Sequence, residues 1–212
     1  MADDLKYGYK GAEPTQSFGN NTGVFDPNDI NNLIADNKWT TFGQLELIET
    51  KNVSASASAI FTDIKADIYN VHFMTVNNFD PSVDNRGLVL RFFENGVEES
   101  ANVYQTAYQY GITNGTFSQE RNTTEDYLLP TFNAGTGTNE VANAYNYFYN
   151  LGDSSKYSFQ TMHQMTFNPS AQGIMAFGSG VLPQASTVDQ IKCFVLSGTY
   201  SADISLYGIR YS

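Results

Sequence analysis

The chain has 212 residues, a length that suits one all-β domain or one domain with a short appendage. Only 16% of the residues are charged, and 15 Phe with 14 Tyr supply far more buriable surface than a disordered chain carries. No run approaches the ~18 consecutive apolar residues of a membrane-spanning helix. The acidic start, Met1–Asp4, also lacks the basic and apolar segments of a signal peptide. We therefore expect a folded protein without membrane insertion.

The charge balance is strongly acidic, because 11 basic and 22 acidic residues give a formal net charge of −11 and a pI near 4.4. Proteins that bind nucleic acid cluster Lys and Arg to pair with phosphates. No two basic residues of this chain are adjacent. We therefore expect no nucleic-acid partner and no binding to an anionic membrane surface.

Cys193 is the single cysteine, so the chain cannot form an internal disulfide. It shares strand parity with Ile191 and Val195, and a strand places residues of one parity on the same face. A reactive thiolate would need a basic neighbour. We predict that Cys193 is a small buried hydrophobic residue.

Residues 1–24 are rich in Gly, Asn and Gln and show no hydrophobic period. Such a segment cannot bury enough surface to fold alone. Its aromatic residues favour an arm that becomes ordered on a neighbouring molecule, because a solubility tail would not need them. We predict that residues 1–40, which include a short helix, anchor the chain in an assembly.

Residues 26–36 carry the helix signal. Asp26 is placed to cap the N-terminus, and Pro27 suits the first helical position. Apolar residues then recur at i, i+3 and i+4, which makes a narrow stripe that needs a packing partner. The side chains expected to serve in anchoring and assembly are Tyr7, Tyr9, Phe18, Phe25, Ile30, Leu33, Ile34 and Trp39.

From residue 42 the pattern changes to the alternation of β-strands. Leu88, Leu90 and Phe92, for example, fall on one face of a predicted strand, with Arg91 on the other. Polar segments containing Gly, Asn, Asp or Pro separate the strands. The ten predicted strands are 42–49, 53–61, 68–76, 87–93, 102–110, 144–149, 157–167, 173–177, 188–196 and 202–211.

Many strands joined by polar turns, without interleaved helices, predict an all-β, antiparallel β-sandwich. We expect a jelly-roll-like version over residues 41–212, after the arm and short helix of residues 1–40. Residues 111–140 are predicted to form a long polar loop. Loops of that length are often functional or contact a partner.

Catalytic residues are scarce in the chain. A nucleophile requires a nearby base, and the histidines that could act as one are His72 and His163. The strand alternation predicts that His72 faces solvent or a neighbouring chain. No G-x-S-x-G motif and no phosphate-binding glycine loop occur. The adjacent acids Glu98–Glu99 and Glu125–Asp126 would point to opposite faces of a strand and so form no catalytic pair. We expect no enzymatic activity and no cofactor.

Metal binding also has little support in the sequence. One Cys and two distant His cannot form a zinc site. Calcium accepts Asp, Asn and backbone oxygens, so Asp80, Asp84 and Asn85, which cluster in one predicted loop, are a weak candidate site. They do not match the EF-hand pattern, and a solvated turn is the favoured interpretation.

Tyrosines are the remaining candidates for a binding surface. Tyr145, Tyr147 and Tyr149 share one strand face and alternate with Asn146 and Phe148. Tyr is enriched in protein interfaces, and aromatic rings also form platforms for sugars. Burial in the core, contact with another protomer and contact with a glycan are the alternatives for Tyr104, Tyr108, Tyr145, Tyr147 and Tyr149.

Six segments of the chain resemble segments of a known class of proteins: Tyr7–Phe18, Asn21–Ile30, Gly43–Ile48, Lys156–Phe159, Ser186–Ile191 and Ile204–Tyr211. The first three resemble the N-termini of small virion proteins of marine tailed bacteriophages. The last is similar to the final strand of many such proteins. The likeness runs over most of the chain, although residues 111–140 have no counterpart in it. These motifs characterise a fold rather than a catalytic site.

The resemblance implies a non-enzymatic structural component of the virion. It implies a tail-associated position, such as a tail fibre, tip or baseplate appendage, with the N-terminal arm docked on other virion proteins. The sandwich would build a homo-oligomer or face outward. A capsid decoration or head-fibre protein is the first alternative, and a carbohydrate-binding module for host attachment is the second.

Overall fold

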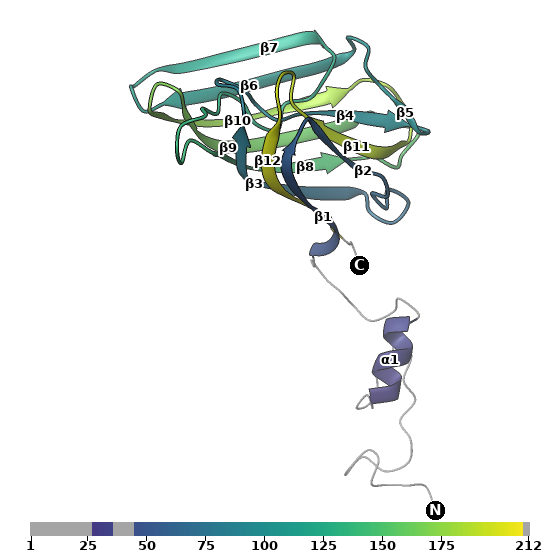
Figure 1. The fold of residues 1–212 in the computed structure, drawn as a ribbon. Coiled ribbons are helices and arrows are strands. Elements are labelled where there is room, and N and C mark those ends of the chain that lie inside the picture. The colour runs from purple at the N-terminus through teal and green to yellow at the C-terminus, as the bar shows by residue number, and fades with distance from the viewer. Residues whose placement is uncertain (1–26, 36–44, 210–212) are drawn as a thin grey trace, which may run out of the picture. The chain divides into compact units, whose positions relative to one another are not determined.

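The computed structural model describes residues 27–35 and 45–209 (Figure 1). The chain divides into two compact units, one made of residues 1–43 with 211–212 and the other of residues 44–210. Helix α1 (Pro27–Ala35) is the described part of the first unit, and the strands belong to the second. The division falls close to the boundary expected between residues 40 and 41.

Helix α1 begins at Pro27, because the fixed φ and missing N–H of proline suit the first helical position. Two residues of the predicted apolar stripe, Ile30 and Leu33, are half-buried, and the third, Ile34, is exposed. The predicted cap Asp26 lies outside the described residues. So do the predicted anchoring residues Tyr7, Tyr9, Phe18, Phe25 and Trp39.

The described part of the second unit contains twelve strands, two more than predicted. They are β1 (Leu45–Ser56), β2 (Ser58–Phe61), β3 (Val71–Pro81), β4 (Val89–Glu94), β5 (Val97–Glu98), β6 (Tyr104–Ile112), β7 (Phe117–Glu125), β8 (Ala142–Tyr149), β9 (Ser158–Asn168), β10 (Gln172–Leu182), β11 (Val188–Phe194) and β12 (Tyr200–Ile209). Every pair of neighbouring strands among them is antiparallel. The prediction of an all-β fold is confirmed.

The strands form two sheets that pack as a β-sandwich (Figure 1). The larger sheet has eight strands in the order β1-β12-β3-β8-β9-β10-β6-β7, and the smaller has four in the order β2-β11-β4-β5. The pairing is nested: β1 pairs with β12, β2 with β11, β3 with β8 and β4 with β5. The first and last strands pair in the larger sheet, and the next strand from each end pairs in the smaller sheet. The following two pairs alternate between the sheets in the same way, as in a jelly roll. The predicted jelly-roll-like sandwich is confirmed, and β9, β10, β6 and β7 extend its larger sheet.

The main core lies between the two sheets. Leu88, Leu90 and Phe92 are completely buried on one side of β4 and the residue before it, while Arg91 points away, as predicted. Cys193 of β11 is also completely buried, which raises the pKa of its thiol to about 12. The prediction that this cysteine is a packing residue is confirmed, because a thiol that stays protonated is a poor nucleophile.

A second, smaller core lies beneath the extension of the larger sheet. It contains Phe132, Met162, Ile174 and Ala176. The segment of residues 128–134 crosses this region and is held by antiparallel bridges from Leu128 to Leu90 and from Ala134 to Arg86. The connection is tight at Gly87, where an added Cβ would lie 2.0 Å from the Thr131 carbonyl oxygen, so a larger residue there would displace the segment.

The prediction of a long loop over residues 111–140 is wrong for its first half. A tight turn after β6 leads into β7, which pairs with β6 along almost its whole length. Most β7 side chains are exposed because β7 is an edge strand, so it lacks the alternation that marks a half-buried strand. The residues after β7 lead into the segment of residues 128–134, which covers the second core.

Candidate functional site

The most distinctive surface is the outward side of the four central strands β3, β8, β9 and β10, which we call the aromatic face. Residues directly opposite each other across neighbouring strands share a side of the sheet, and the register therefore identifies its members. They are Phe73, Thr75 and Asn77 of β3, Asn143, Tyr145, Tyr147 and Tyr149 of β8, Phe159, Thr161, His163, Met165 and Phe167 of β9, and Met175, Phe177, Ser179 and Val181 of β10.

Large apolar side chains on this face are open to solvent. Six of them are between 41% and 67% exposed: Tyr145, Phe159, Met165, Phe167, Met175 and Phe177. A monomeric soluble protein carries scattered exposed apolar residues, but a continuous apolar patch marks a contact surface. Their contiguity in the sheet, rather than the exposure of any one of them, makes this face a candidate site.

The aromatic face carries no Asp, Glu, Lys or Arg. The whole chain has 11 basic and 22 acidic residues, so this uncharged surface spans four strands of a strongly acidic molecule. Depletion of charge together with enrichment in Tyr, Phe and Met is the compositional signature of the centre of a protein interface.

Strand β9 shows an inverted pattern of polarity. Its inner side chains include the buried Gln160, Gln164 and Thr166, whereas Phe159 and Phe167 point outward. In an isolated sandwich the apolar side of a strand would face the core. The inversion therefore adds the outward side of β9 to the candidate contact surface.

Neighbouring rings on the aromatic face support one another. The ring centroids of Phe73 and Tyr147 lie 4.8 Å apart, and those of Tyr147 and Tyr149 lie 6.5 Å apart in a stacked arrangement. The Tyr145 hydroxyl lies 2.7 Å from His163 Nδ1, with the two rings perpendicular. These contacts restrict the side-chain rotamers, so the face is partly preorganised for binding.

The five tyrosines proposed for a binding surface separate into two groups. Tyr145, Tyr147 and Tyr149 lie together on the aromatic face, while Tyr104 and Tyr108 point to the opposite side of the larger sheet. Tyr104 is completely buried, and its hydroxyl accepts from the Phe92 N–H and donates to the Glu99 carbonyl, so it serves the core.

Tyr108 packs against Phe132 in the second core, with ring centroids 5.1 Å apart. Its hydroxyl donates to Glu120 of β7. Burial raises the pKa of Tyr108, and the hydrogen bond to Glu120 raises it further. Tyr108 therefore joins β7 to the second core and does not belong to the aromatic face.

The two histidines have opposite environments. The expectation that His72 faces solvent or another chain is wrong, because its side chain is completely buried and its Nε2 lies 2.7 Å from the Ile64 carbonyl oxygen. The predicted side of the strand was correct, but that side of β3 packs against the core instead of facing solvent. His163 is exposed on the aromatic face beside Tyr145.

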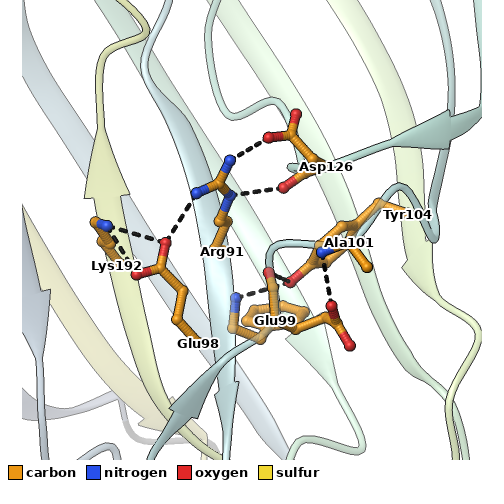
Figure 2. A network of polar contacts seen from close by, with 8 residues as sticks. Arg91, Glu98, Glu99, Ala101, Tyr104, Asp126 and Lys192 are labelled. Carbon is orange, nitrogen blue, oxygen red and sulfur yellow. Dashed lines mark hydrogen bonds and ion pairs between the residues drawn. The ribbon is translucent and has the colours of Figure 1, made fainter.

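The adjacent acidic pairs join a charged network on the outer side of the smaller sheet. Figure 2 shows Arg91 between Glu98 and Asp126, with Lys192 on the far side of Glu98. Burial raises the pKa of Glu98, but hydrogen bonds from Lys192 and Arg91 outweigh it, and the pKa lies below its ordinary value. Glu98 and Asp126 are thus paired with cations, whereas Glu99 accepts from the Ala101 N–H and Glu125 accepts from the Asn122 amide.

The residues of the weak calcium candidate, Asp80, Asp84 and Asn85, do not form a set of metal ligands in the described structure. Asp84 Oδ1 accepts hydrogen bonds from the Thr136 N–H and hydroxyl, each at 2.8 Å, which fixes one loop on another. Within residues 27–35 and 45–209, no three His, Cys, Asp or Glu side chains come together in a way that could hold a metal ion. No helix in these ranges has the length and apolar character needed to cross a bilayer.

Sequence reasoning missed half of the aromatic face. The outward positions of Phe159, Met165, Phe167, Met175 and Phe177 were not predicted, although the alternation within 157–167 and 173–177 was. Apolar residues at alternating positions are normally assigned to the core. The one signal that could have shown the inversion is the polar set Gln160, Gln164 and Thr166 at the intervening positions.

Comparisons of the chain with protein-family models, with curated proteins and with solved structures found no match.

Proposed function

We propose that this chain is a non-enzymatic structural protein of a bacteriophage particle, placed on the tail and docked through its N-terminal residues. The observation that carries the proposal is the uncharged aromatic face, which suits a protein that works by contact with other subunits. The jelly roll agrees with it by analogy, since this architecture recurs in viral capsid proteins. The resemblance of the segments 7–18, 21–30 and 204–211 to phage virion proteins supplies the assignment to a phage.

The chemistry of the described residues is consistent with a structural role. One member of each acidic pair, Glu98 or Asp126, forms an ion pair, Cys193 is buried, and His72 is enclosed by the sandwich. His163 has a hydroxyl neighbour in Tyr145, and no carboxylate of residues 27–35 or 45–209 pairs with it to orient it as a base.

The test is the location and copy number of the chain in intact particles, by cryo-electron microscopy and quantitative mass spectrometry. A copy number that matches the tail symmetry supports the proposal. A number that matches the capsid lattice would instead indicate a head decoration protein. Absence from purified particles overturns the proposal.

The anchoring role has its own test in full-length chains. Simultaneous substitution of Tyr7, Tyr9 and Phe18 by Ala should greatly lower occupancy on the particle, because aromatic side chains dominate the energy of protein contacts. Substitution of the exposed Val97 by Ala is the control and should leave occupancy unchanged. Full occupancy of the triple variant would show that anchoring lies elsewhere.

Glycan binding is the second candidate function, favoured by the cluster of Tyr145, Tyr147, His163 and Thr161 on one open surface. Jelly rolls also include lectin domains. A glycan array of host polysaccharides tests it with the wild-type chain and with Tyr147→Ala. Binding that the substitution abolishes would support adhesion, and no binding across the array would remove this candidate.

A further inference from the structure

We infer that the aromatic face is a homotypic interface, covered in solution by the same face of a second copy of this chain. The inference deepens the proposed function, because it names the occupant of the surface that carries that proposal. It rests on three independent observations: the distribution of charge, the area of the face and the inverted polarity of β9.

The charge distribution limits which surfaces can meet this face. Taking a charged side chain out of water without a partner is unfavourable. The outer side of the smaller sheet carries Arg91, Lys192 and Glu98, and the edge strand β7 carries Glu120 and Arg121. Among the described strand surfaces, the aromatic face itself is therefore the surface that can cover a second aromatic face without burying charge.

Net charge leads to the same conclusion. Two copies, each with a formal charge of −11, repel one another, and the repulsion grows as charged surfaces approach. Contact through the uncharged faces keeps the acidic residues on the outer parts of the pair. Contact through the outer side of the smaller sheet or through β7 would bring charged side chains together.

The area of the face fits a stable dimer. Strands lie ~4.8 Å apart and rise ~3.3 Å per residue, so four strands of about nine residues present ~600 Å². Adding β6, whose residues on this side (Gln105, Ala107, Gln109 and Gly111) are also uncharged, gives ~700 Å² by the same geometry. Specific interfaces bury about 600–1,000 Å² on each partner, a range that includes this area.

The geometry of the contact follows from sheet packing. Two sheets that pack face to face lie ~10 Å apart with their strands at about −30°, and their side chains interdigitate. The alternation of large rings with Thr161, Ser179 and Thr75 on the aromatic face provides gaps into which the partner's rings could insert. A symmetric pair would bury both faces in one isologous contact.

A matched pair of substitutions in the full-length chain tests the inference. Phe177 lies on the aromatic face and is 52% exposed, and Leu196 lies in the loop after β11 and is 53% exposed. Phe177→Glu should weaken self-association at least ~10-fold, because it places an unpaired charge within the interface. Leu196→Glu should leave it unchanged. Sedimentation velocity over a dilution series measures both, and circular dichroism checks that each variant is folded.

A photo-crosslinker at Tyr147 identifies the occupant directly. Light and heavy isotope-labelled full-length chains are mixed, and crosslinked peptides are identified by mass spectrometry. Heavy–light crosslinks to β3, β8, β9 or β10 support the inference. Crosslinks within one chain to residues 1–43, or between chains to any other surface, overturn it.

The remaining outcomes separate this inference from the proposed function. A wild-type chain that stays monomeric over the dilution series overturns the homotypic contact. If that monomer is still found in particles, the structural role stands and another virion protein covers the face. If it binds host polysaccharide instead, the face is an adhesion surface. A dimer that is absent from particles confirms the contact but overturns the phage role.

Discussion

On the inner side of the larger sheet, a buried polar side chain can hydrogen-bond the backbone of a segment that is not part of any strand. Gln164 is the clearest case, because its side-chain oxygen accepts from the Phe132 N–H at 2.7 Å and its amide nitrogen donates to the Phe132 carbonyl at 3.3 Å. One side chain thus satisfies both polar groups of a residue in the covering segment. Gln160 instead donates to the side-chain oxygen of Asn146 on the paired strand β8, at 2.8 Å.

The Gln164 bridge should be important for stability. Gln164→Ala would leave the buried polar groups of Phe132 without their partner, which costs about 1–3 kcal/mol of unfolding free energy. Urea denaturation of the wild type and the variant measures the difference. Gln109→Ala, at an exposed position of β6, is the matched control and should leave the unfolding midpoint unchanged. Equal loss in both variants would contradict the role of the bridge.

His72 should make stability depend on pH. Burial lowers its pKa from the ordinary value, and the hydrogen bond to the Ile64 carbonyl offsets part of that effect. Above about pH 6.5 both the folded and the unfolded chain hold a neutral imidazole, so the full stability is present. As the pH falls below that value the unfolded chain gains a proton first, and stability is lost until the folded pKa is reached.

The expected contribution of His72 is at most about 1.4 kcal/mol for each pH unit between the two pKa values. His72→Gln, which keeps a hydrogen-bond donor but does not titrate, should show a smaller fall in unfolding free energy between pH 7 and pH 5. His163→Gln, at the exposed histidine, serves as the control and should retain the wild-type fall. An unchanged fall in His72→Gln would exclude this residue as its origin.

Individual elements of the smaller sheet are joined by the charged network of Figure 2. Arg91 of β4 donates to Glu98 of β5 and to Asp126, and Lys192 of β11 donates to Glu98. The Arg91 guanidinium also stacks over Phe194, with its central carbon 4.8 Å from the ring centroid. The network therefore connects three strands and the segment that follows β7.

Removal of the central cation tests this connection. Arg91→Met keeps an apolar stem over Phe194 but leaves Asp126 without its ion pair, and we expect a loss of about 1–3 kcal/mol, moderated by partial solvent exposure. Lys65→Met, in the exposed pair with Asp63, should not change the thermal midpoint. Thermal unfolding followed by circular dichroism compares the variants, and an Arg91→Met midpoint equal to that of the wild type would contradict a stabilising network.

The whole molecule combines an acidic surface with one uncharged face. Salt screens repulsion between acidic surfaces over a Debye length of about 8 Å at physiological ionic strength. If copies meet through the aromatic face, added salt should strengthen self-association, because the contact itself holds no ion pairs to be screened. Sedimentation at low and high salt measures this trend. Weaker association at high salt would indicate that ion pairs hold the copies together.

Much of the fold was predictable because its signals are local. The alternation of apolar residues in segments such as 87–93 and 188–196 depends only on the period of a strand, and polar turns mark where strands end. Pro27 similarly indicated the start of α1. The edge strand β7 was missed because a strand exposed on both sides needs no alternation, and its residues match the composition of a loop.

The aromatic face was predictable only in part. Tyr145, Tyr147 and Tyr149 were placed on one side of a strand, but their neighbours on β9 and β10 were not. Neighbours across a sheet are far apart in sequence, so their proximity follows from register and topology rather than from local pattern.

The sequence by itself determined that the protein is a β-sandwich, that it is acidic, and which residues share a side of each strand. Tertiary structure alone decided which of those sides is packed. His72 and Tyr104 became buried, and Phe177 became exposed, because the smaller sheet and the segment of residues 128–134 cover one side of the larger sheet. Periodicity distinguishes two sides of a strand but carries no information about which side another layer will cover.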